Sequence, residues 1–156
     1  MSKRQSVLSF VVWLLIPFAA ATVGARFGPG EWYAQLAKPA WNPPGYVFGP
    51  VWTILYAMMG IAAWFVWREH GPAEAKLSFG LFFAQLILNA CWTYLFFGLQ
   101  APGLALMEIL LLWVFILLTL VAFWRIKPLA GVLLIPYLGW VTFAATLNYQ
   151  LWVLNR

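Results

Sequence analysis

Charged residues are scarce in this chain. Lys, Arg, Asp and Glu together make up only 8% of its 156 residues, and aspartate does not occur at all. Because an average soluble domain carries about 25% charged residues, this chain cannot cover a water-facing surface. It has one cysteine and one histidine, and no group of side chains has the spacing of a metal site. These shortages exclude a soluble enzyme, a disordered tail, a disulfide-stabilised scaffold and a bound metal.

Apolar side chains, by contrast, dominate the composition. Hydrophobic residues make up 65% of the sequence, and the mean hydropathy is +0.87. A membrane-spanning helix needs about 20 apolar residues, and the polar breaks in this chain leave room for five. The sequence therefore predicts an all-α membrane protein, a five-transmembrane-helix bundle that forms a single domain over residues 1–156. The helices are expected at residues 6–26, 47–68, 73–97, 104–124 and 129–155.

The first of these helices follows Lys3 and Arg4, as the apolar part of a secretory signal peptide would. Because the stretch from Val7 to Ala25 is long enough to span a bilayer, an uncleaved helix is the better interpretation. Most Lys and Arg residues lie at the N-terminus and in the second and fourth connections, which predicts a cytoplasmic N-terminus. The expected location is a bacterial cell membrane, with the lipid bilayer as partner. The basic residues form no patch, so no nucleic-acid partner is expected.

Eleven tryptophans are more than membrane anchoring requires. Tryptophan is enriched at membrane interfaces, and this accounts for the five near helix ends: Trp52, Trp64, Trp67, Trp124 and Trp152. Six others lie deeper in the helices or in the first connection: Trp13, Trp32, Trp41, Trp92, Trp113 and Trp140. A subset of these is expected to frame a binding site, while Trp13 and Trp113 have no assigned role.

Amide and aromatic side chains inside the predicted helices define three candidate binding faces. Each face repeats at intervals of three or four residues, the spacing that puts side chains on one side of a helix. The faces consist of Trp52 and Tyr56; Gln85, Asn89, Trp92 and Phe96; and Trp140, Ala144, Leu147 and Asn148. Buried amides are costly unless they bond across helices or to a bound molecule, and both uses are open here. Together the faces suit a flat apolar ligand with a few polar groups.

Apart from Glu74, the second residue of the predicted helix 73–97, Glu108 is the one acid inside a predicted helix. An acid within a membrane span is a functional candidate by default, and the alternative is that its side chain reaches the interface.

The small-residue pairs Ala20/Gly24 and Gly80/Ala84 suit close contacts between helices of one copy or of two copies. A haem iron would need an axial ligand, and the helices contain no histidine, so a metal-free ring fits better than ligated haem.

Three stretches carry a family resemblance: WYAQLAKPAWNPPGYVFGPVWTILYAMMG (32–60), QLILNACWTYLFFG (85–98) and PYLGWVTFAATLNY (136–149). They resemble the translocator protein (TspO/MBR) family, also called tryptophan-rich sensory protein or peripheral-type benzodiazepine receptor. The resemblance implies a five-helix bundle, often a homodimer, whose pocket opens toward the first connection. It further implies binding of porphyrins such as protoporphyrin IX, or of other flat apolar molecules, with no required cofactor.

The resemblance also implies roles for individual residues. Trp52 and Asn89 match contacts to a ligand carbonyl, and Trp140, with Trp32 near it, matches the tryptophan of light-dependent porphyrin breakdown. No catalytic residue is assigned apart from these two. The full set of expected ligand-binding residues is Trp32, Trp41, Pro44, Trp52, Tyr56, Asn89, Trp92, Phe96, Trp140, Phe143, Ala144, Leu147 and Asn148.

The family's C-terminal cholesterol motif is incomplete here. Leu147 and Tyr149 are present, but six residues separate Tyr149 from Arg156, one more than the pattern allows. Cholesterol is therefore not an expected partner.

The leading hypothesis is a membrane protein that binds and senses porphyrins and contributes to their transport. Lys38 or Arg26 would pair with the propionates, and the prolines of residues 42–44 would stiffen a lid. The alternatives are light-dependent porphyrin degradation and a ligand-regulated membrane scaffold.

Overall fold

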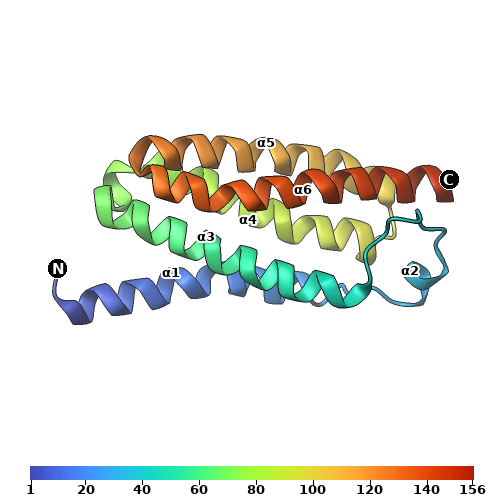
Figure 1. Ribbon diagram of the computed structural model, residues 1–156, viewed down its shortest axis with the longest axis horizontal. Helices are drawn as coiled ribbons and strands as arrows, with labels where there is room; N and C mark the ends of the chain where they lie inside the picture. The colour runs from blue at the N-terminus through green and yellow to red at the C-terminus, as the bar shows by residue number, and fades with distance from the viewer.

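The computed structural model describes residues 1–156 and contains only helices and their connections (Figure 1). Five helices are long and apolar enough to cross a membrane, which confirms the predicted five-helix membrane bundle. They are α1 (Lys3–Gly24), α3 (Gly45–Glu74), α4 (Lys76–Thr93, continued by the π-helical turn η1, Tyr94–Gly98), α5 (Pro102–Ile126) and α6 (Pro128–Asn155). A further short helix, α2 (Glu31–Gln35), lies in the first connection, where no element was expected.

The long helices form a ring. α1 packs against α3 and α4, α3 packs against α6, and α5 packs against both α4 and α6. The N-terminus lies at one end of the bundle, while α2 and the C-terminus lie together at the other end (Figure 1). The first connection is therefore close to the last turn of α6, although more than 100 residues separate them in sequence.

Proline and glycine set the ends of several helices. Pro102 and Pro128 occupy first helical positions, where the missing N–H has no partner to lose and the fixed φ already suits a helix. Near the end of α3 the helix kinks at Gly71, whose φ of 68° lies in the left-handed region that glycine adopts without strain. An ion pair of 2.8 Å between Lys127 Nζ and Glu69 Oε1 then ties the α5–α6 turn to the end of α3.

The outer face of the bundle is apolar. Val7, Leu8 and Leu15 of α1 are exposed, as are Leu110 and Leu118 of α5. An apolar outer face is the expected arrangement for helices that contact lipid rather than water. The protein is therefore an integral, multi-pass membrane protein.

Trp13 and Trp113, which had no assigned role, both join helices. The Trp13 ring of α1 stacks on Phe79 of α4, with ring centroids 4.9 Å apart. The indole Nε1 of Trp113 on α5 donates to Thr142 Oγ1 of α6 at 2.8 Å. A deep tryptophan whose N–H finds a partner is an ordinary packing residue, and this describes Trp113. The stacking of Trp13 on Phe79 likewise gives Trp13 a packing role, between α1 and α4.

The small-residue pairs have different surroundings. A Cβ at Gly24 would lie 3.3 Å from Thr93 Oγ1, so Gly24 is part of the α1–α4 contact. Gly80, by contrast, has nothing within 4 Å of such a Cβ. Its face of α4 is open, and the homodimer that the sequence predicts stays a prediction.

A close crossing of α1 and α3 was not anticipated, and it leads to the first testable prediction. A Cβ at Gly60 of α3 would lie 2.7 Å from both Leu14 Cα and Trp13 O of α1, which is closer than real contacts allow. We expect Gly60→Ala to push α1 away and to lower the free energy of unfolding by about 1–3 kcal/mol, the usual cost of overpacking. Thermal unfolding in detergent measures the loss.

The matched control for this prediction is Gly80→Ala, which introduces the same methyl group into a helix where space is open. That variant should be neutral or slightly more stable, because alanine is the better helix former. Equal unfolding temperatures for the two variants would show that α1 does not depend on the close approach at Gly60.

Candidate functional site

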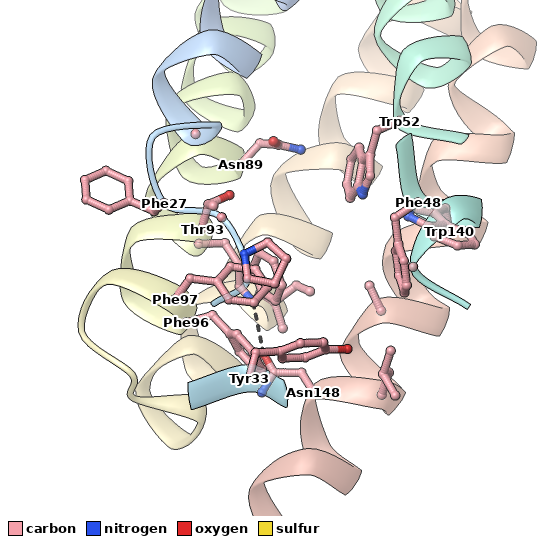
Figure 2. Close-up of a pocket in the computed structure, with 18 of the residues that line it drawn as sticks. Phe27, Tyr33, Phe48, Trp52, Asn89, Thr93, Phe96, Phe97, Trp140 and Asn148 are labelled. Carbon is pink, nitrogen blue, oxygen red and sulfur yellow. Dashed lines mark hydrogen bonds between the residues drawn. The ribbon is translucent and has the colours of Figure 1, made fainter. Parts of the chain in front are cut away.

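A cavity of about 780 Å³ lies inside the bundle at the end that carries α2 (Figure 2). Its walls come from α1, α3, α4 and α6, its inner side includes two residues of α5, and parts of the first connection cover it. Its volume falls in the range of about 300–1,000 Å³ that is usual for small-molecule sites. The site is therefore built by the ring of helices, and the connection closes one end.

Nine of the 29 residues that line the cavity are aromatic. Trp52 stacks on Tyr56 with centroids 5.5 Å apart and meets Trp140 of α6 edge-on at 6.5 Å. On the opposite side, Trp92 stacks on Phe96 at 5.0 Å. Figure 2 shows Trp52 and Trp140 projecting from their helices toward the cavity. Such rings offer flat apolar surfaces against which a planar molecule packs well.

The amide of Asn89 belongs to a buried network across three helices. Tyr56 Oη donates to Asn89 Oδ1 at 2.7 Å, and Asn89 Nδ2 donates to Tyr137 Oη at 2.8 Å. Tyr137 Oη in turn donates to Gln85 Oε1 at 2.7 Å. The two amides on the α4 face thus serve as connections between α3, α4 and α6, one of the two uses that the sequence left open.

Asn148 has a similar structural role nearer the end of the bundle that carries α2. Its Oδ1 accepts from Trp92 Nε1 at 2.9 Å, and its Nδ2 donates to the Pro102 carbonyl at 2.8 Å. It therefore joins α6 to both α4 and the start of α5. Among the residues that line the cavity, Trp140 Nε1 and Asn42 Oδ1 are buried without a hydrogen-bond partner. The wall therefore holds an unpaired buried donor and an unpaired buried acceptor.

The ammonium group of Lys38 is engaged within the first connection. Lys38 Nζ donates to the carbonyls of Tyr33 at 2.7 Å and Leu36 at 3.1 Å, and it lies 4.6 Å from the centroid of the Tyr33 ring. It thus caps the C-terminal end of α2, where the Tyr33 carbonyl accepts only one backbone bond, from Leu36 N at 3.2 Å. Arg26 does not line the cavity. The expected pairing of either residue with a propionate stays a prediction.

Most of the residues that the sequence predicts for ligand binding line the cavity. Those that do are Pro44, Trp52, Tyr56, Asn89, Trp92, Phe96, Trp140, Ala144, Leu147 and Asn148. Three others, Trp32, Trp41 and Phe143, lie in a second row behind the wall. Trp32 packs edge-on against Phe96 at 5.7 Å, and Trp41 packs in the same way against Phe143 at 5.7 Å. Trp32 thus supports a lining residue directly, whereas Trp41 does so through Phe143, whose ring lies 5.3 Å from that of the lining residue Trp140.

Several lining residues were not predicted. Phe48 comes one helical turn before Trp52, so extending the period of that face backwards would have identified it. Thr93 and Phe97 likewise lie on α4 and η1, close to the predicted face. Phe27 and Tyr33 belong to the first connection, which has no periodic pattern that signals which side chains point inward.

Glu108 lies outside this site. Both carboxylate oxygens are buried without a hydrogen-bond partner, and the residue does not line the cavity. The side chain therefore does not reach a polar surface, as the interfacial alternative required, and it contributes no ligand contact here.

Fold and site together define a class: a multi-pass membrane protein with an aromatic cavity between its helices. The TspO/MBR family model matches residues 12–153. The chain is 45% identical to the translocator protein of Homo sapiens over 143 residues, which cover 88% of this chain and 85% of the relative. It is also 45% identical to the tryptophan-rich protein TspO of Chlorobaculum tepidum over 159 residues, covering 97% and 99%.

A third relative, the tryptophan-rich sensory protein of Cereibacter sphaeroides, is 42% identical over 146 residues, which cover 94% of this chain and 90% of the relative. With most of the chain matched by the family model and by these relatives, the protein belongs to the TspO/MBR family. The resemblance found in the sequence is confirmed. Light-dependent porphyrin breakdown at Trp140 stays a prediction.

Proposed function

We propose that the protein binds porphyrins, such as protoporphyrin IX, in the cavity between its helices and acts as a membrane sensor for them. A contribution to porphyrin transport is part of the same proposal. The relatives' names, tryptophan-rich sensory protein and translocator protein, agree with a sensing or transporting role. The size of the cavity and its aromatic walls support a planar apolar ligand.

The observation that carries the proposal is the state of the polar groups around the cavity. The amides of Asn89 and Asn148 have partners within the protein, whereas the buried indole N–H of Trp140 has none. A buried donor without an acceptor costs about 1–3 kcal/mol. A ligand acceptor at this position would remove that cost, while Trp52 and Phe48 would pack on the ring.

Fluorescence titration of the purified protein in detergent with protoporphyrin IX tests this function. We expect the porphyrin to quench tryptophan fluorescence with saturation. The double variant Trp52→Phe/Trp140→Phe should bind at least about tenfold more weakly, which corresponds to about 1.4 kcal/mol. Two indole surfaces and their two N–H donors are lost, while the phenyl rings keep the fold packed.

The control for this experiment is Trp64→Phe/Trp124→Phe, which removes the same number of fluorophores from positions that do not line the cavity. Its dissociation constant should match that of the unmodified protein, even though the total fluorescence falls. If both double variants bind with unchanged affinity, the porphyrin does not occupy this cavity and the proposed site is wrong.

A further inference from the structure

The first connection is tied to the end of α6 by one side chain. We call residues 27–44 of this connection the lid segment, because its residues cover the cavity. The backbone N–H of Ala37 donates to Asn155 Oδ1 at 2.8 Å, and Asn155 Nδ2 donates back to the Ala37 carbonyl at 2.9 Å. One amide group thus satisfies both backbone groups of a single lid residue, in the way a neighbouring β-strand would.

Asn155 is itself held in position. Its Nδ2 also donates to the Leu151 carbonyl, one turn earlier on α6, at 2.7 Å. Leu151 lines the cavity. The orientation of the Asn155 amide is therefore fixed by the same helical turn that forms part of the cavity wall.

The lid segment has no other hydrogen bond to the transmembrane helices beyond its own ends. Its remaining backbone bonds are local, such as Asn42 N to the Pro39 carbonyl, and Lys38 bonds only to carbonyls of the segment itself. Elsewhere the segment is held by apolar packing, in which Trp32 lies on Phe96 and Trp41 lies on Phe143. The two bonds of Asn155 are thus the one directional attachment of the segment.

We infer that Asn155 is a positioning residue that holds the lid segment closed and so sets the rate at which a ligand leaves the cavity. This inference rests on the proposed function. Ala37 lies within the lid segment, between α2 and the prolines that follow. Both of its bonds to Asn155 must therefore break before the segment can move away from the cavity. Changes in affinity within one site appear mostly in the dissociation rate, and this attachment acts on that rate without touching the ligand.

Asn155→Ala tests the inference with two measurements. In ligand-free protein, amide hydrogen exchange across residues 36–38 should become faster, because Ala37 loses its acceptor. In stopped-flow experiments, dissociation of protoporphyrin IX should become about tenfold faster, equivalent to about 1.4 kcal/mol, while the association rate changes little. Asn155→Asp, which keeps an acceptor but loses the donor, should give a smaller increase in exchange.

The matched control is Gln150→Ala, which removes an amide from the same end of α6 where it makes no hydrogen bond to the lid segment. It should change neither rate. Unchanged exchange at residues 36–38 in Asn155→Ala would overturn the attachment itself, and faster exchange with unchanged dissociation would overturn its role in retaining ligand.

The same data separate this inference from the proposed function. If protoporphyrin IX fails to bind even the unmodified protein, the proposed function and the role of Asn155 in retaining the ligand are both wrong. The hydrogen-exchange measurement still decides whether Asn155 holds the lid segment. If Asn155→Ala only lowered the unfolding temperature, with equal rates in the folded protein, the residue would be structural and the inference wrong.

Discussion

Replacing Ala144 by phenylalanine is expected to lower the affinity for protoporphyrin IX by at least about 100-fold, or about 2.8 kcal/mol. Ala144 follows Trp140 by one turn of α6, and both residues line the cavity. A phenyl ring at this position would fill space that the porphyrin needs. Because the ring enters an existing cavity, burying it should leave the unfolding temperature unchanged or raise it. Titration and thermal unfolding of the same preparation measure both effects.

The control for the Ala144 substitution is Thr146→Phe. Thr146 is exposed on the same helix, and its hydroxyl bonds only to the Thr142 carbonyl one turn earlier. A phenyl ring there meets lipid or detergent and should leave porphyrin affinity unchanged. Full affinity in Ala144→Phe would mean that the ligand binds elsewhere on the protein, and equal losses in both variants would point to a general disturbance of α6.

The sequence predicts the five long helices well because the bilayer dictates their length and composition. Any segment that spans lipid must form all its backbone hydrogen bonds internally and present apolar side chains outward. Both requirements can be recognised in one amino-acid sequence. α2 has no such constraint. It has only five residues, lies between glycines and prolines, and owes its form to the carbonyl contacts of Lys38 and to the attachment at Ala37.

The same difference separates the parts of the cavity that the sequence predicts from those that it does not. Trp52 with Tyr56, and Trp140 with Ala144, are related by helical spacing, so each pair faces one direction wherever the helix packs. Trp32 and Trp41 lie in the first connection, where nothing local decides which rings point inward. The structure puts them behind Phe96 and Phe143.

Hydrogen-bond partners across helices are the feature that the sequence reveals least. The spacing of Gln85 and Asn89 shows that two amides share a face, but the partner Tyr137 lies about 50 residues away. Which tyrosine meets which amide depends on the vertical register of α4 against α6. That register follows from packing of the whole bundle, and this is why both uses of the amides stayed open until the helices were placed.

Tyr137 is the central residue of this network, and Tyr137→Phe should give the largest loss of stability among single-atom changes in the site. Its side chain is fully buried, and its hydroxyl accepts from Asn89 and donates to Gln85. Hydrogen bonds between membrane helices are worth about 0.6 kcal/mol on average and up to about 1.7. With two bonds lost and Gln85 Oε1 left without a donor, we expect a loss of about 1–3 kcal/mol, measured by unfolding in detergent.

Two further variants decide whether that loss comes from the network. Tyr149→Phe removes the same hydroxyl from an exposed residue that makes no hydrogen bond through it, and should cost almost nothing. Gln85→Leu should cost less in the Tyr137→Phe protein than in the unmodified one, because the acceptor it removes is by then already unpaired. Additive losses from the two substitutions would instead show that Tyr137 and Gln85 stabilise the bundle independently. The bond between these two side chains would then contribute nothing to the joining of α4 and α6.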